Sequence, residues 1–267
     1  MLRNILLKTL RDQRRALFWW TIGITVPILI YVVVSYPTIR DNQQYDELLK
    51  AYPPEMMNLL LAGADSFTSP AGYLQGALFA LIVPLMFMIF AIGRGAHAIA
   101  GEEDEKTLEL LLAHPVGRGR VVLEKFGALI AATALLGIIF WLMLWAGATA
   151  VEMDISASNL AAATIGVLCL GLLFGTLALA IGAITGNRGL SIGIAAAVGL
   201  GAYMLNGLGQ NIEALEEIRK VSPFYLYIGN LPLQNGLSLG HMAALLGATL
   251  VLLFLAIVTF NRRDVSV

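Results

Sequence analysis

The chain has 267 residues and a formal net charge of −1, with 17 Lys and Arg residues against 18 Asp and Glu residues, a balance that gives no indication of nucleic-acid binding. Hydrophobic residues make up 58% of the chain and charged residues 13%, against about 45–50% and 25% in an ordinary soluble domain. The mean hydropathy of +0.78 agrees, and the composition excludes a soluble single domain.

Residues 1–15 predict an amphipathic helix on the inner membrane surface. Leu2, Ile5, Leu6 and Leu10 recur at helical spacing, and five cations make the segment strongly basic. Cations beside an anionic leaflet favour membrane binding. An alternative is that these cations only keep this side of the first span in the cytoplasm, and one helix can do both.

Six long stretches contain no Asp, Glu, Lys or Arg, and each is long enough to cross a hydrocarbon core of about 30 Å as a helix. Together they hold 133 residues, so all 35 charged residues fall in the other 134. They are continuously apolar, whereas the strands of a membrane barrel alternate. The sequence therefore predicts an all-α integral membrane protein, one domain over residues 1–267, with transmembrane helices at residues 16–36, 72–93, 126–148, 160–185, 189–208 and 240–260.

The distribution of cations predicts the orientation of these spans. Thirteen Lys and Arg residues lie on the side that holds both termini, and four lie on the other side. The flank richer in Lys and Arg stays in the cytoplasm, so both termini are expected there. The first span is longer than the 7–15 residues of a signal-peptide core, and we expect it to be retained.

The longest predicted cytoplasmic segment, residues 94–125, contains an acidic cluster followed by leucines. Four acidic residues at 102–105 are typical of a helix start, where they complement the positive end of the helix dipole. Leu108, Leu111 and Leu112 lie on one side of such a helix, and Pro115 ends it. The pattern predicts a short helix over residues 102–114, whose apolar face packs on lipid, on the subunit's own helices or on a partner protein.

Small residues recur at four-residue spacing within the predicted spans, which lets helix backbones approach closely. We favour packing within one subunit over a dimer interface. The spans contain no Asp, Glu, Lys or Arg, and so offer no proton relay or intramembrane ion site of the usual kind. The small residues are Gly72 with Gly76, Gly171 with Gly175, Gly182 with Gly186, and Gly193 with Ala197 and Gly201.

Two patterns of catalytic or metal-binding type also occur. Residues 236–240 match G-x-S-x-G, but a nucleophile elbow follows a strand, and Ser238 is explained by a role as helix N-cap. His97 and His114 flank the acidic residues 102–105, yet carboxylates at a helix start account for that cluster without a metal. We therefore predict no catalytic, cofactor-binding or metal-binding residue, and an intramembrane hydrolase using Ser238 is the less favoured alternative.

The most distinctive pattern of the chain lies between residues 102 and 120. The acidic residues are followed by Thr107-Leu-Glu-Leu-Leu-Leu and then by His114-Pro-Val, with Arg118 and Arg120 ahead of the third predicted span. This pattern resembles the signature of the permease subunits of type-2 ABC exporters, in which Gly is common where Lys106 stands here. The resemblance extends over the basic N-terminal helix, the six spans and the predicted external loop at residues 209–239, with its Ser-Pro-Phe and Asn-Gly sequences.

The resemblance implies that residues 102–114 form a coupling helix, which fits a groove on a separate ATP-binding-cassette subunit and is braced by the N-terminal helix. It also implies a complex of two permease subunits, identical or paralogous, and two ATPase subunits that bind ATP and Mg²⁺. This chain has no GxxxxGK[ST] sequence with which to hold ATP phosphates itself. The implied coupling residues are Glu102, Glu103, Glu105, Thr107, Leu108, Glu109, Leu111, Leu112, His114, Pro115, Arg118 and Arg120.

We therefore expect a permease subunit of an ATP-driven exporter in a prokaryotic cytoplasmic membrane, with membrane lipid and no nucleic acid among its partners. A membrane scaffold or assembly protein without transport is the alternative. The sequence does not identify the cargo. Met86, Phe87, Met88 and Phe90 suit a lipid-like cargo if they face the pathway, but residues that face lipid look the same.

Overall fold

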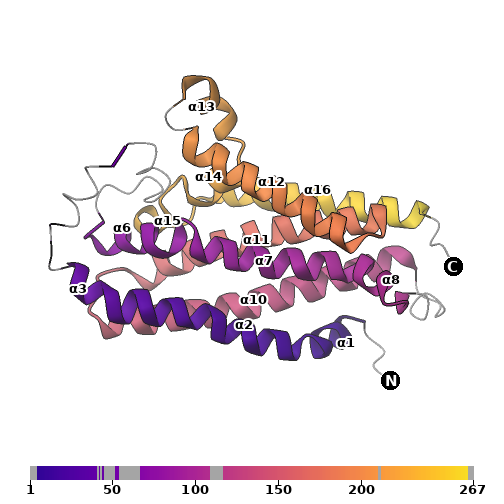
Figure 1. Ribbon diagram of the computed structural model, residues 1–267, viewed down its shortest axis with the longest axis horizontal. Coiled ribbons are helices and arrows are strands. Elements are labelled where there is room, and N and C mark those ends of the chain that lie inside the picture. The colour runs from indigo at the N-terminus through magenta and orange to yellow at the C-terminus, as the bar shows by residue number, and fades with distance from the viewer. Residues whose placement is uncertain are drawn as a thin grey trace.

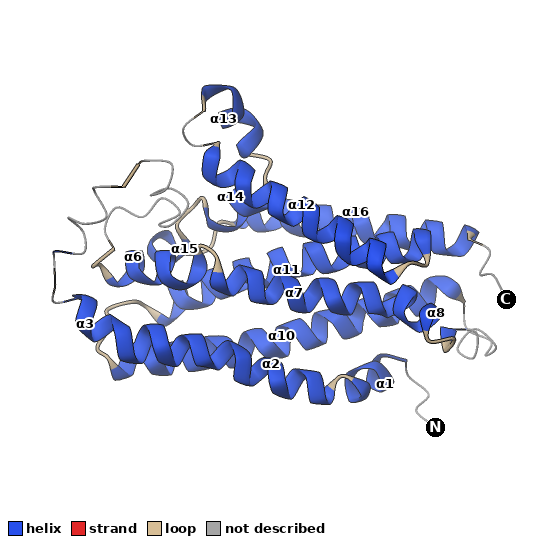
Figure 2. Cartoon of the chain, viewed as in Figure 1, coloured by secondary structure: helices blue, strands red, loops and turns tan. Residues whose placement is uncertain are grey.

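The computed structural model describes residues 5–40, 42, 44, 52–53, 67–108, 117–209 and 212–263. Within these ranges all regular structure is helical, as Figure 2 shows. Six helices are long and apolar enough to cross a membrane, and each contains one of the predicted stretches. The predicted all-α fold with six transmembrane helices is thereby confirmed. The six spans, numbered one to six in chain order, are Arg14–Arg40, Pro70–Asp104, Arg118–Ala150, Ala157–Thr185, Arg188–Leu208 and Leu239–Arg262.

The first two spans are built from several helical pieces. A short helix, α1 (Ile5–Asp12), precedes span one, which consists of α2 (Arg14–Pro27), the π-helix η1 (Ile28–Ser35) and α3 (Tyr36–Arg40). Proline lacks the N–H that an α-helix needs, and α2 gives way to η1 directly after Pro27. Span two contains α6 (Pro70–Leu74), η2 (Gln75–Phe79), α7 (Ile82–Ala96), η3 (His97–Gly101) and α8 (Glu102–Asp104).

The other four spans are single helices: α10 (Arg118–Ala150), α11 (Ala157–Thr185), α12 (Arg188–Leu208) and α16 (Leu239–Arg262). Both ends of α11 follow ordinary capping chemistry. The Ser156 hydroxyl accepts the N–H of Asn159 at the start of α11, and Gly186 ends α11 in the left-handed conformation, with φ of 64°. Between spans five and six lie three short helices, α13 (Glu213–Arg219), α14 (Pro223–Ile228) and α15 (Pro232–Asn235).

The spans form a bundle with α11 at its centre. Helix α11 contacts α7, α10, α12 and α16, and 78% of its most apolar 18-residue window is buried, against 17% for span one and 22% for span five. Figure 1 shows α13, α14 and α15 at one end of the bundle, together with α3 and α6. The opposite end, where α1, α8 and the last turn of α16 lie, is referred to below as the α8 end.

The contact between spans two and four depends on glycine. A Cβ atom on Gly175 would lie 2.8 Å from the carbonyl oxygen of Ala91, and one on Gly171 would lie 3.4 Å from that of Phe87. Both glycines belong to the predicted small-residue pattern, and they pack within the subunit. Gly193 and Gly201 of α12 have nothing within 4 Å of such an atom, so this part of the pattern lies on an open face.

The segment between spans five and six packs partly into the core. Phe224, Tyr227 and Ile228 of α14 are buried in the main apolar cluster, and the Tyr227 hydroxyl donates a hydrogen bond to the carbonyl oxygen of Phe79 (2.9 Å). The structure therefore anchors α14 to spans two and four, while α13 projects away from the bundle (Figure 1).

Candidate coupling site

The acidic cluster lies at the end of span two, where the chain leaves the bundle. The helix that begins at Pro70 continues through η3 and α8 to Asp104, so the acidic residues end a long helix. The prediction that they begin a helix over residues 102–114 is wrong in this respect. Carboxylates are unfavourable next to the negative end of a helix dipole, and nearby cations must offset that cost.

The helix stops at residues 105–107 in a Schellman motif. The Thr107 N–H donates to the carbonyl oxygen of Glu102 (2.8 Å), and the Lys106 N–H donates to that of Glu103 (3.0 Å). Lys106 adopts the left-handed conformation, with φ of 56°. Glycine is the usual residue at this position because it has no Cβ to clash. Lys106, which stands where the resemblance described above implies Gly, therefore falls on a position where a side chain is strained.

A buried ion pair joins the end of span two to the start of span three. The Lys125 ammonium group donates to Glu102 Oε1, and Lys125 is only 5% exposed. A charge buried to this degree needs a partner, because desolvation of an unpaired ion costs several kcal/mol. Lys125 therefore offsets the negative charge at the end of span two and fixes its position against α10.

A second ion pair joins the same acidic cluster to span six. Arg263 Nη2 donates to Glu103 Oε1 over 2.5 Å, and Arg263 Nη1 donates to the carbonyl oxygen of Ala183, at the end of α11, over 3.5 Å. The Arg118 guanidinium in turn donates to the backbone oxygen of Arg263. Through Arg263 the junction connects spans two, three, four and six at the α8 end.

Leu108, the first leucine of the predicted docking face, packs inside the subunit. It is 1% exposed and belongs to an apolar cluster with Ile99, Val122 and Phe260. Of the alternatives open for this face, packing on the subunit's own helices therefore holds for Leu108. A partner protein cannot use this side chain for docking.

The remaining described residues of the predicted site make local contacts. Glu105 lies 4.0 Å from Nδ1 of His97, measured from its Oε1. Arg120 pairs with Glu124 (2.8 Å), whose other carboxylate oxygen accepts the N–H of Ile5 (2.8 Å). Glu124 therefore caps the start of α1 and holds it against α10. The predicted residues Glu109, Leu111, Leu112, His114 and Pro115 lie outside the described residues.

Three contributors to this junction were not predicted as site residues: Lys125, Arg263 and Glu124. In the sequence, Lys125 and Arg263 counted only among the thirteen cations that predict the orientation of the spans. One available signal is the position of Lys125, the last charged residue before a 23-residue apolar stretch. A lysine at such a boundary is a candidate for partial burial with an acidic partner.

The G-x-S-x-G sequence lies at the start of span six. Ser238 is the N-cap residue of α16, but its side chain makes no capping hydrogen bond, so the expected capping role is only positional. His241 packs near Tyr225, with 5.6 Å between ring centroids. No strand precedes Ser238 in the part of the chain that the structure describes, so the setting of a nucleophile elbow is missing here. The same ranges hold no group of three metal-ligating side chains.

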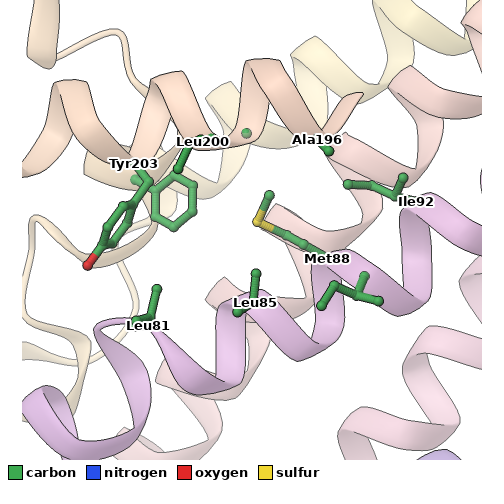
Figure 3. Close-up of a pocket in the computed structure, with 10 residues that line it drawn as sticks. Leu81, Leu85, Met88, Ile92, Ala196, Leu200 and Tyr203 are labelled. Carbon is green, nitrogen blue, oxygen red and sulfur yellow. The ribbon is translucent and has the colours of Figure 1, made fainter. Parts of the chain in front are cut away.

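An apolar cavity of about 140 Å³ lies between spans two and five. Leu85 and Met88 of α7 face Leu200 and Tyr203 of α12 across it, as Figure 3 shows. Met88 lines this cavity, whereas Phe87 packs on Phe140 in the core and Phe90 packs on Trp20. The cavity lining is apolar apart from the Tyr203 hydroxyl, and it suits hydrocarbon chains better than ions.

The all-helical fold with six apolar spans agrees with the comparison with known families. No curated protein matches this sequence. A family model described as ABC-2 family transporter protein matches residues 3–265, nearly the whole chain. The chain is a multi-pass membrane protein that belongs to the ABC-2 transporter family.

Proposed function

We propose that this chain is the permease subunit of an ATP-driven exporter in a prokaryotic cytoplasmic membrane, with its α8 end in the cytoplasm. A separate ATP-binding-cassette subunit docks there, at the segment that follows span two. The observation that supports the proposal best is the ion-paired junction, in which Glu102 and Glu103 hold the end of span two to Lys125 and Arg263. A force applied next to this junction reaches spans two, three, four and six at once.

The mechanism follows from the stiffness of these connections. Residues 105–108 are tied to the bundle by the Schellman hydrogen bonds and by the burial of Leu108. The second carboxylate oxygens of Glu102 and Glu103 are buried and have no hydrogen-bond partner among the described residues. They offer acceptors to donors of the segment that follows or of a docked subunit. When two ATPase subunits close on ATP and Mg²⁺, the displaced segment shifts span two against spans three and six.

We further propose that two permease subunits, identical or paralogous, form the pathway between them. Span five supports this, because Gly193, Ala197 and Gly201 form an exposed small-residue face on α12. Small residues on a membrane helix allow close approach of another helix. The apolar cavity between α7 and α12 adjoins this face and suits an amphipathic or lipid-like cargo.

The docking proposal is tested with the complete chain co-expressed with the ATP-binding-cassette proteins of the same genome. Leu111→Asp and Leu112→Asp should abolish co-purification of the ATPase and the stimulation of ATP hydrolysis by cargo. Leu237→Asp, at the opposite end of the bundle, is the matched control because Leu237 is exposed and far from the junction. Leu108→Asp is unsuitable, since a carboxylate in that buried position would unfold the α8 end.

Undiminished ATPase binding and transport in both leucine variants would contradict docking at this segment. If the variants bind the ATPase but lose transport, these leucines transmit the movement of the ATPase to the spans and are not needed for docking. If no ATP-binding-cassette protein co-purifies with the unaltered chain, the permease proposal fails and the scaffold alternative gains support.

A further inference from the structure

Three arginines converge at the break between α1 and α2. Arg11, Arg14 and Arg15 line a polar hollow of about 250 Å³ together with Asp12. All three are exposed, and none forms an ion pair with another described residue. This contrasts with Arg118, Arg120 and Arg263 at the same end of the bundle, whose guanidinium groups are bound within the subunit.

The position of Trp20 sets the depth of this cluster in the membrane. The Trp20 ring packs on Phe90 with 5.6 Å between ring centroids, and the Arg94 guanidinium lies 6.0 Å from the same Phe90 ring. Arg94 is the first charged residue after the apolar stretch of span two. Arg14 and Arg15 lie about one and a half helical turns before Trp20 in α2, toward the α8 end, and Arg11 lies beyond the break between α1 and α2. They are therefore at the boundary between hydrocarbon and headgroups.

Next to the arginines, span one presents an aromatic and apolar surface. Phe18 and Trp19 are 61% and 68% exposed and contact each other edge to face, with 5.7 Å between centroids. Ile22, one turn further along, is also exposed. Tryptophan favours the membrane interface. A phospholipid whose phosphate is bound by the arginines would place its hydrocarbon chains along this surface.

We propose that Arg11, Arg14 and Arg15 form a binding site for the phosphate of an anionic phospholipid in the leaflet at the α8 end. Arginine suits this ligand because its planar guanidinium group donates two parallel hydrogen bonds to phosphate. The exposed aromatic surface favours a lipid over an acidic protein surface, because a soluble partner would not cover side chains at hydrocarbon depth. The inference does not depend on the proposed ATPase docking.

The test measures lipid binding to the purified full chain by native mass spectrometry, with dioleoylphosphatidylglycerol as the anionic lipid and dioleoylphosphatidylcholine as the zwitterionic reference. The double variant Arg14→Gln with Arg15→Gln should bind the anionic lipid roughly 25-fold more weakly, at about fivefold for each cation near the surface. The matched control, Arg188→Gln with Arg262→Gln, removes two exposed cations at the same end that do not line the hollow. It should weaken binding clearly less than the double variant does, because these cations do not contact the bound phosphate, and an equal loss in both would overturn the proposal.

Two further variants guard against a folding defect. Arg15→Gln alone should weaken binding about fivefold. Asp12→Asn should strengthen it, because Asp12 is the one acidic residue among the described residues that line the hollow. Phosphatidylcholine binding should stay constant throughout. Equal affinity of the unaltered chain for both lipids, or unchanged affinity in the double and single arginine variants, overturns the proposal.

Two other outcomes assign the arginines to a different ligand. If inorganic phosphate or glycerol 3-phosphate displaces the anionic lipid at equal concentration, the site binds a soluble anion and the lipid assignment is overturned. If the arginine variants keep their lipid affinity and lose a co-expressed ATPase, the surface belongs to that subunit, and the proposal is overturned as well.

Discussion

Spans four and five carry similar small-residue patterns and use them in different ways. On α11, Gly171 and Gly175 face the backbone of span two at close range, and most of the helix is buried. On α12, Gly193 and Gly201 face open space, and only 22% of the most apolar window is buried. A small-residue pattern therefore indicates that another helix can approach the surface closely, and the tertiary structure decides whether a helix of the same subunit does so.

Substitution of a glycine in each span should separate the two uses most strongly. Gly175→Leu forces a side chain into the carbonyl of Ala91, a backbone atom that cannot move aside, and should lower the free energy of unfolding by about 3 kcal/mol or more. Gly201→Leu enters open space and should leave the stability of the subunit within about 0.5 kcal/mol. Thermal unfolding of the purified subunits in detergent measures both changes.

The same pair of variants sharpens the proposed role of α12. Gly201→Leu should weaken association between permease subunits, as measured by cross-linking in the membrane, while Gly175→Leu should reduce the amount of folded subunit. If Gly201→Leu leaves association unchanged, the open face of α12 meets lipid and the proposed dimer uses another surface.

The buried ion pair at the α8 end should contribute the next largest effect, because it joins the end of span two to the start of span three in a buried position. Lys125→Met leaves Glu102 without its partner and should cost about 3 kcal/mol of unfolding free energy. Arg120→Met removes a cation of an exposed pair on the same helix and should cost at most about 1 kcal/mol. Chemical denaturation of both variants gives the comparison.

The double variant Glu102→Gln with Lys125→Met provides the control for the buried pair. It should recover most of the stability that Lys125→Met loses, because no unpaired charge stays buried. Equal losses for Lys125→Met and Arg120→Met would show that the Lys125 pair is solvated and does not brace the junction.

The smallest expected effect is a gain of stability at the end of span two. Lys106→Gly relieves a side chain held in the left-handed conformation and should raise the free energy of unfolding by about 1 kcal/mol. Lys106→Ala keeps a Cβ atom and should give no comparable gain, so it serves as the control in the same thermal unfolding assay. A loss of stability in Lys106→Gly would indicate that the lysine side chain makes a contact that outweighs the backbone strain.

The candidate site was only partly predictable. The sequence placed Glu102, Glu103, Arg118 and Arg120 in one functional segment, and the first three do meet near the end of span two. It misassigned the acidic cluster to a helix start, because carboxylates can also lie at the C-terminal end of a helix when cations from elsewhere offset the unfavourable interaction with the helix dipole. Here Lys125 and Arg263 supply those cations from 23 and 160 residues away, and no local pattern reports such distances.

The sequence by itself determined the number and approximate extent of the spans. Charged side chains are excluded from the hydrocarbon core, so each span appears in the sequence as a long stretch without Asp, Glu, Lys or Arg. The sequence also determined that the segment at residues 102–120 differs from the other segments between spans, because an acidic cluster is followed there by leucines. Only the tertiary structure decided which charges pair, which small residues touch and which arginines have no ion-pair partner among the described residues. These outcomes depend on contacts between residues that are distant in the sequence. Lipid chains and neighbouring helices both favour an apolar helix face, so hydropathy cannot distinguish a face that contacts lipid from one that contacts another helix.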